Sequence, residues 1–201
     1  MSFRRAGARQ QGLSLVELIA FIVIVSIAVL GVVQLFGLGS RFSADPLARK
    51  QALSIAESLL EEVELARFTY CDPDDTRAET ATGAFVGAAG CALTLEDVGS
   101  VAGEARPFDN VNDYVSQYNL AQESFKAGGV LADANLAPVT LDAGRAGAYR
   151  ATLTIVPEAL GGIASGPAPA DADVLRIRVE VFYGSTDSVV LEGYRVRYAP
   201  N

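Results

Sequence analysis

The chain has 201 residues, 50% of them hydrophobic, and a formal net charge of −8. It contains no histidine, which excludes Ser-His and Cys-His catalytic pairs, and no glycine-rich phosphate loop precedes a lysine. Without Arg4, Arg5 and Arg9, 13 basic residues face 24 acidic ones, and this net charge of −11 disfavours nucleic acid as a partner. We therefore expect neither an enzyme nor a nucleic-acid-binding protein, and no cofactor.

The N-terminal region combines a short basic segment, residues 1–12, with a long apolar stretch. No charged residue lies between Glu17 and Arg41. As a helix, Leu18 to Leu38 would be about 31 Å long, close to the hydrocarbon thickness of a bilayer. Residues 13–40 are therefore predicted to cross a membrane once.

The charges that precede the apolar stretch predict its orientation. They are all positive, so the N-terminus is expected in the cytoplasm and the chain beyond Arg41 on the other side of the membrane. A secretory signal cut after Gly39 is the alternative interpretation, because Gly37-Leu38-Gly39 fits a small-x-small cleavage site. Helical periodicity resumes soon afterwards, which a signal peptide does not explain.

The next segment is predicted to be an amphipathic helix. Gly37, Gly39 and Ser40 weaken the helix before it, and Asp45-Pro46 either kinks the helix or starts its second half. A continuous helix over residues 13–68 would be about 84 Å long. Apolar residues then recur at spacings of three and four on one face: Ala52, Ile55, Ala56, Leu59, Leu60, Val63 and Ala66.

Residues 70–147 are rich in Gly, Ala, Asp and Asn and show weak periodicity. We interpret them as loops with short elements, including a strand near Cys91 to Leu95. A helix over Val111 to Lys126 is the alternative to a loop there.

Three segments in the last third of the chain are predicted as strands, because apolar and polar residues alternate in them. They are residues 148–156, 174–183 and 189–198, and a Gly/Pro/Ala loop at 161–172 joins the first two. Gly193 is predicted to mark a bulge in the third segment. The apolar face of this segment is predicted to consist of Val190, Tyr194, Val196 and Tyr198.

The chain has two cysteines, Cys71 and Cys91, and both follow the apolar stretch. In an oxidising compartment a disulfide between them is the expected state, and a buried pair of free thiols is the alternative. A metal site is disfavoured because the chain offers no histidine and no further cysteine as ligand.

Two acidic clusters raise the question of calcium binding. Neither has the alternating oxygen ligands, central glycine and terminal glutamate of a helix-loop-helix calcium site. Asp and Asn side chains also form turns with their own backbone, and we favour that explanation and predict no metal. The clusters are Asp72, Asp74, Asp75 and Asp109, Asn110, Asn112, Asp113.

The N-terminal motif resembles a known signal. Gly12 is followed by Leu13-Ser14-Leu15-Val16-Glu17 and an uninterrupted apolar stretch, after a basic leader. This combination resembles the class III signal of type IV pilins and type II secretion pseudopilins. Leu13 stands where that family usually has phenylalanine.

The resemblance implies how the chain is processed and assembled. A prepilin peptidase would cut between Gly12 and Leu13 and N-methylate Leu13. Glu17 would then pair with the amino terminus of a neighbouring subunit during filament assembly. An interfacial glutamate of a plain membrane anchor is the alternative role for Glu17.

A narrower resemblance reaches beyond the signal. Residues 43–63, 68–75 and 108–114 are similar to the D-type minor pilins of the MSHA (mannose-sensitive haemagglutinin) pilus and their PilV-like relatives. It implies a single-pass protein of the inner membrane with its bulk in the periplasm, which later joins a fimbrium at the cell surface and contributes to pilus biogenesis or adhesion. The implied partners are the prepilin peptidase, other major and minor pilins and the pilus assembly platform.

The expected fold is α+β and type IV pilin-like, with a long N-terminal helix whose second half packs on a small antiparallel sheet. The expected divisions are a leader at 1–12, a transmembrane and filament-core helix at 13–40, and an extracytoplasmic domain at 41–201. A secretion pseudopilin, or a plain anchored binding domain, would share much of this pattern.

Overall fold

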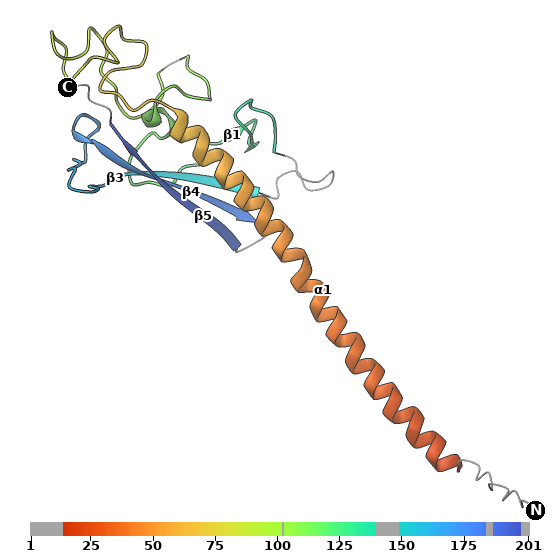
Figure 1. Cartoon of the computed structure of the whole chain (residues 1–201). Helices are drawn as coiled ribbons and strands as arrows, with labels where there is room; N and C mark the ends of the chain where they lie inside the picture. Colours follow the sequence, from red (N-terminus) through yellow and green to blue (C-terminus); the bar gives the residue numbers. More distant parts are fainter. Residues whose placement is uncertain (1–13, 102, 140–148, 184–186, 198–201) are drawn as a thin grey trace, which may run out of the picture. The chain divides into compact units, whose positions relative to one another are not determined.

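The computed structural model describes residues 14–101, 103–139, 149–183 and 187–197, with backbone alone for 35–46. The chain forms two units, residues 1–46 and 47–201, which are treated separately below. The elements are α1 (Leu15–Leu65), the 3-10 helices η1 (Val111–Tyr114) and η2 (Pro169–Asp171), and the strands β1 (Lys126–Ala127), β2 (Val130–Leu131), β3 (Tyr149–Pro157), β4 (Val174–Tyr183) and β5 (Asp187–Val196) (Figure 1). The α+β class is confirmed.

Helix α1 is unbroken in its backbone from Leu15 to Leu65, so Asp45-Pro46 does not begin a separate helix. It ends a few residues before the predicted end at Phe68. The amide of Ala66 bonds to the carbonyl of Val63 in a tighter last turn.

The second half of α1 carries the predicted apolar face. Ala52, Ala56 and Val63 have no exposed surface, and Leu59 is 2% exposed. They belong to one hydrophobic core with the inward side chains of the sheet, such as Leu153 on β3. The prediction that this half of the helix covers the sheet is confirmed, because the period of 3.6 residues places small and branched side chains on one stripe.

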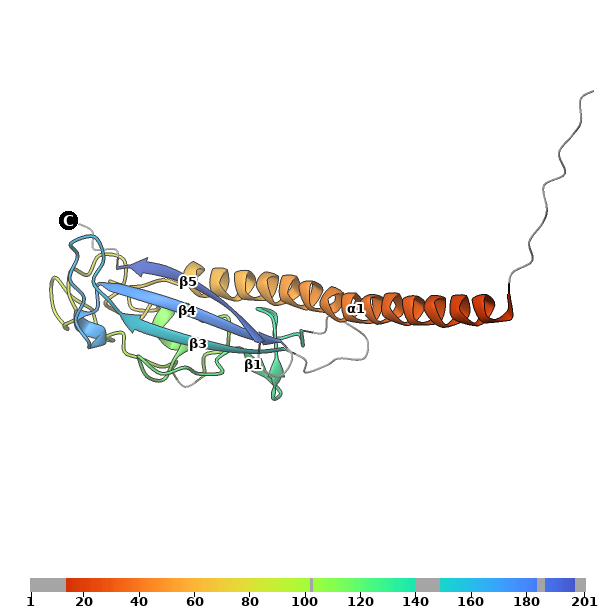
Figure 2. The same cartoon turned by 90° about the horizontal axis from the view of Figure 1, so that it is seen from below.

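The main sheet has three antiparallel strands in the order β3-β4-β5 (Figure 2). All three predicted strands are confirmed, with small shifts at their ends. In β4, Ile177, Val179 and Val181 are fully buried, while the charged residues between them are half-buried on the opposite face. This is the alternation expected of a strand with one face in the core.

The predicted apolar face of β5 is wrong. Val190, Tyr194 and Val196 are 36%, 41% and 42% exposed, whereas Val189 and Leu191 pack against the core. Both faces of this strand carry apolar residues, so parity alone did not identify the buried one. Gly193 and Arg195, which made the true inner face look polar, are the residues that misled the prediction.

Gly193 does not form the predicted bulge, because it pairs directly with Ile177 in an uninterrupted register. It lies instead where the strand approaches α1. A methyl group on Gly193 would collide with the end of the Glu64 side chain. A glycine within a strand can mark either a bulge or a close approach to another segment, and the sequence alone does not distinguish the two. At Gly193 the second explanation holds, because the strand lies close to α1 there.

The middle of the chain is mostly loop, as predicted. The predicted strand near Cys91 to Leu95 is wrong, since only isolated bridges occur there, Cys71 with Leu95 and Val86 with Cys91. The alternative helix over 111–126 is reduced to η1. In place of regular strands and helices, single backbone hydrogen bonds join loops that are distant in the sequence, such as that from the amide of Glu96 to the carbonyl of Tyr70.

A buried ion pair ties this loop region to α1. Arg106 donates from Nε and Nη2 to the two carboxylate oxygens of Glu62 at 2.6 and 2.7 Å, and Tyr114 Oη donates to the same carboxylate at 3.1 Å. The two charged side chains are only 4% and 6% exposed. Such a bidentate pair fixes geometry strongly, because a buried charge that loses its partner is costly.

The end of β5 is held by a second buried arginine, Arg197. Its guanidinium lies over the rings of Phe68 and Tyr70, with 4.1 and 4.3 Å from Cζ to the ring centroids. It donates to backbone carbonyls, among them those of Thr69 and Ala172. The residues that follow α1 and those that follow β5 are therefore bound to each other.

Candidate functional site

The most unusual surface of the described chain is the first part of α1. Side chains of residues 14–34 are all exposed. Leu15–Gln34 has a mean hydropathy of 2.9 and is 0% buried, so this is one candidate membrane-spanning segment near the N-terminus. As a helix of 20 residues it is about 30 Å long, which matches a bilayer core. An exposed apolar surface of this size is typical of a segment that contacts a membrane or another protein.

Glu17 is the single charged side chain of this segment and is exposed. It lies in the first turn of α1, where the partial positive charge of the helix N-terminus favours a carboxylate by about 0.3–1 kcal/mol. The predicted position of Glu17 at the start of an apolar helix is therefore present in the structure. Its role in assembly stays a prediction.

Ser14 is a site residue that the sequence reasoning missed. Its Oγ accepts a hydrogen bond from the backbone amide of Glu17 at 3.3 Å, so Ser14 acts as the N-cap of α1. The signal was available, because Ser14-Leu15-Val16-Glu17 has the spacing of a capping box. The family motif drew attention to the glutamate and away from its cap.

Ser26, within the apolar segment, donates its hydroxyl to the carbonyl of Ile22 at 2.7 Å. This internal bond satisfies the hydroxyl, and no water is needed there. Gly12 and Leu13, the predicted cleavage and methylation sites, lie outside the described residues.

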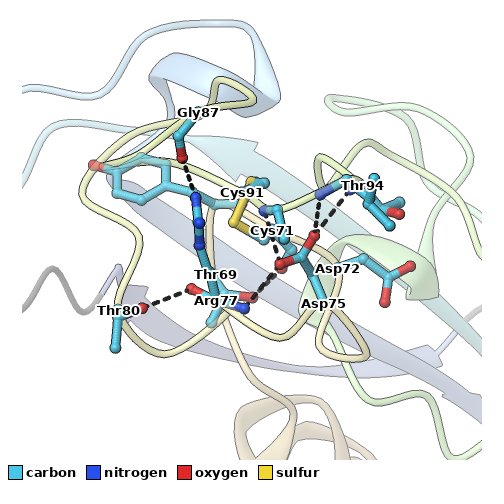
Figure 3. The surroundings of a disulfide bond; sticks show 12 residues. Thr69, Cys71, Asp72, Asp75, Arg77, Thr80, Gly87, Cys91 and Thr94 are labelled. Carbon is cyan, nitrogen blue, oxygen red and sulfur yellow. Dashed lines mark hydrogen bonds between the residues drawn. A yellow bond between two sulfur atoms is a disulfide. The ribbon is translucent and has the colours of Figure 1, made fainter.

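The predicted disulfide is present between Cys71 and Cys91, whose Cα atoms are 5.4 Å apart (Figure 3). Both cysteines are fully buried, with Ala78 and Ala81 beside them. The bond closes a loop over a sequence separation of 20 residues, which we call the disulfide loop. A disulfide that closes a loop of this length stabilises the folded protein by about 3 kcal/mol, because it lowers the conformational entropy of the unfolded chain.

Asp75 organises the disulfide loop (Figure 3). Its carboxylate accepts hydrogen bonds from the backbone amides of Ala92, Leu93 and Thr94 at 3.0, 2.7 and 3.0 Å. It also accepts one from the amide of Arg77 at 2.8 Å. These bonds lower the pKa of Asp75 well below its ordinary value, mainly through the amides of Thr94 and Leu93.

The first acidic cluster thus forms turns, as favoured above. Asp72 accepts the amide of Asp74 at 2.8 Å in the same way that Asp75 accepts that of Arg77. Among the described residues, no group of three or more acidic, histidine or cysteine side chains is arranged to hold a metal ion.

Two buried carboxyl groups, that of Glu96 and that of Asp113 in the second acidic cluster, have raised pKa values. Burial, followed by the neighbouring Asp113, raises the pKa of Glu96 to about 9. Burial, followed by Glu104, raises the pKa of Asp113 to about 7. Both side chains are less than a tenth exposed, so at neutral pH Glu96 keeps its proton and Asp113 is close to its titration point.

The described residues of the unit 47–201 form open grooves, three of which are the most pronounced. One, of about 550 Å³, lies between the last turns of α1 and Pro107–Asp109, and a second, of about 510 Å³, shares Ser58 with it. The third, of about 490 Å³, has three charged lining residues, Arg67, Glu79 and Arg195. None of the three grooves is lined by a predicted site residue.

Comparisons with known proteins leave the family open. No protein-family description matches the chain, and no curated protein or solved structure matches it either.

Proposed function

We propose that this chain is a minor pilin subunit of a type IV pilus of the MSHA type, anchored and assembled through the first part of α1. The observation that carries the proposal is the exposed apolar segment Leu15–Gln34 with a single carboxylate, Glu17, in its first turn. The class III signal motif around Gly12 adds the specific family. The disulfide in the unit 47–201 agrees with an extracytoplasmic location of that unit.

In the proposed route, a prepilin peptidase cuts between Gly12 and Leu13 and methylates Leu13. The cut lies on the N-terminal side of Ser14, so the cap of α1 survives processing. In a helix the new amino group would be only about 6 Å along the axis from Glu17, so both groups could lie near the headgroup level of the membrane.

Glu17 would then act in assembly. Within a bundle of apolar helices an unpaired carboxylate is expensive, and the amino terminus of a neighbouring subunit is the counter-charge within reach. Pairing selects one axial register between neighbouring helices. The subunit would thereby enter the filament from the inner membrane through the pilus assembly platform and display its acidic unit outside.

A type II secretion pseudopilin would use the same anchor and the same glutamate. The two proposals differ in the machinery served, so genes encoding pilus or secretion components beside this one would decide between them. A plain anchored domain would keep Met1, and a secreted one would begin at Ser40.

The first experiment is mass spectrometry of the N-terminus in protein from membranes and sheared filaments. N-methylated Leu13 is expected; an intact Met1 or a start at Ser40 refutes the processing. In a second experiment, Glu17→Ala should leave cleavage and membrane insertion unchanged and reduce incorporation into filaments by about tenfold or more, since a lost charge pair of about 1.4 kcal/mol has that effect. Ser14→Ala, which removes only the cap, is the matched control and should assemble.

A further inference from the structure

The two edges of the main sheet differ. The outer edge of β3 is closed by the segment 119–122: Asn119 donates to the carbonyl of Ile155 at 2.9 Å, and Gln122 and Leu153 exchange bonds of 2.9 and 2.8 Å. On the other side of the sheet, β5 is the last strand. Its outer edge has no such cover among the described residues.

The hydrogen-bond phase of the ladder shows which groups face outward. Arg197 donates to the carbonyl of Asp173 at 2.8 Å, and this pair continues the register of β4 and β5. In an antiparallel ladder, bonded residues alternate with unbonded ones, so every second residue of β5 directs its amide and carbonyl away from β4. These residues are Ser188, Val190, Glu192, Tyr194 and Val196.

None of these outward amides and carbonyls bonds to another described residue. The strand is 10 residues long and contains neither proline nor lysine. Natural proteins usually protect such an edge with charged side chains, proline, a bulge or a short strand. Of these devices β5 has only the charged side chains of Asp187, Glu192 and Arg195. Val190, Tyr194 and Val196 add exposed apolar side chains beside the free backbone groups. The edge has the properties of a template for one more strand.

The strand leads to a groove that carries positive charge. Val196 and Arg195 line the cavity of about 490 Å³, together with Arg67 and Glu79, so its lining holds two cationic side chains and one carboxylate. Arg195 donates from Nη2 to the carbonyl of Ala66 at 3.0 Å, and its Nε has no partner within the described part of the chain. No carboxylate of a described residue forms an ion pair with it.

Arg67 is also weakly neutralised. Its nearest carboxylate, that of Glu79, is 4.0 Å away, and the two side chains are 53% and 80% exposed. A pair of this kind contributes about 0–1 kcal/mol. The cavity thus holds two arginines with unused hydrogen-bond donors, although the chain as a whole has a net charge of −8. A carboxylate is the ligand that suits a guanidinium group best.

We propose that β5 binds an extended segment of a partner protein as an added strand, and that an acidic residue of this segment places its carboxylate in the groove of Arg67 and Arg195. Backbone bonds to the outward groups supply affinity, and the groove supplies selectivity for the acidic residue. The inference uses residues of the unit 47–201 only, so it stands independently of the anchoring role proposed above.

The test is a selection with a phage-displayed library of random peptides about as long as the 10-residue strand β5, against the full chain in detergent micelles. Enriched peptides should alternate apolar and polar residues and carry Asp or Glu. Tyr194→Pro removes an outward amide and leaves the β4 ladder intact, while Tyr194→Thr removes the same ring and keeps the amide. Binding should be about tenfold weaker to the proline variant than to the threonine variant, because a peptide carbonyl stays unpaired.

A double-mutant cycle tests the groove. It combines Arg195→Gln in the protein with replacement of the peptide's acidic residue by the corresponding amide. Each single change should weaken binding about tenfold, and the second should cost little once the first is made, because the two changes remove one interaction. Arg67→Gln is the second groove variant, and Arg150→Gln, which lies over Phe182 on the outer face, is the control that should bind normally. Thermal unfolding establishes that each variant is folded, and Val190→Pro replaces Tyr194→Pro if the latter is not.

Three outcomes overturn the proposal. One is a selection without enriched peptides, and another is equal binding to the proline and threonine variants. The third is a wild-type dimer that becomes a monomer in Tyr194→Pro, because the edge would then belong to a second copy of this chain.

Discussion

Replacing Arg106 by methionine should destabilise the unit 47–201 more than any surface substitution. The change leaves the Glu62 carboxylate buried at 6% exposure, with Tyr114 Oη at 3.1 Å as its remaining hydrogen-bond donor among the contacts described above. Breaking a buried ion pair by removing one partner costs about 3–5 kcal/mol. The remaining bond from Tyr114 offsets about 1 kcal/mol of this. We expect a loss of about 3 kcal/mol in the free energy of unfolding.

The double variant Glu62→Met with Arg106→Met should recover most of that loss. Two apolar side chains in place of a buried ion pair are often neutral or stabilising, and about 1 kcal/mol should remain because Tyr114 loses its acceptor. The expected coupling between the two sites is therefore at least about 2 kcal/mol, as residues in direct contact show.

The assay is urea unfolding of the full chain in micelles, followed by near-ultraviolet circular dichroism of the tyrosines, since the chain has no tryptophan. Arg178→Met is the matched control, because its ion pairs lie on the exposed face of the sheet and should be worth less than about 1 kcal/mol. The reasoning is refuted if Arg106→Met costs no more than Arg178→Met, or if the double variant loses the sum of the single losses.

Three further predictions concern the loops. The pKa of Glu96, raised to about 9, and that of Asp113, raised to about 7, exceed their unfolded values of 4.5 and 3.8, so the stability that these two carboxyl groups contribute is complete below about pH 4 and is lost as the pH rises toward 9. The lowered pKa of Asp75 acts in the opposite direction, because its contribution is lost as the pH falls below about 4. Glu96→Gln should flatten the profile above about pH 4 and stabilise the protein at pH 7 by at most about 3 kcal/mol in urea titrations. Reduction of the bond between Cys71 and Cys91, or its replacement by alanines, should lower stability by about 3 kcal/mol, and free thiols found by mass mapping of unreduced protein would contradict the bond. Asp75→Ala should speed hydrogen exchange at the loop amides that bond to its carboxylate, with exchange in β4 unchanged.

Much of the framework was predictable because it depends on local periodicity. The apolar stripe between Ala52 and Ala66 and the alternation in β4 were both read correctly, since each places one face in a core. The disulfide followed from compartment and from the count of two cysteines. Ser14 had a recognisable signature that the stronger family motif obscured.

The remaining features depend on contacts between distant residues. Arg106 and Glu62 are 44 positions apart, and nothing in their local sequence indicates that they pair. The alternation of apolar and polar residues also did not identify the buried face of β5. Gly193 and Arg195 lie on that face because of their contacts with Glu64 and Ala66 at the end of α1. The open edge of β5 likewise became visible only with the order of the strands.

The bonds of Arg197 and Arg195 have a mechanical consequence. Arg197 joins the carbonyl of Thr69, just after α1, to that of Ala172, just before β4, and Arg195 bonds to Ala66. A force applied to helix α1 would reach the sheet both through these hydrogen bonds and through the buried face of the helix.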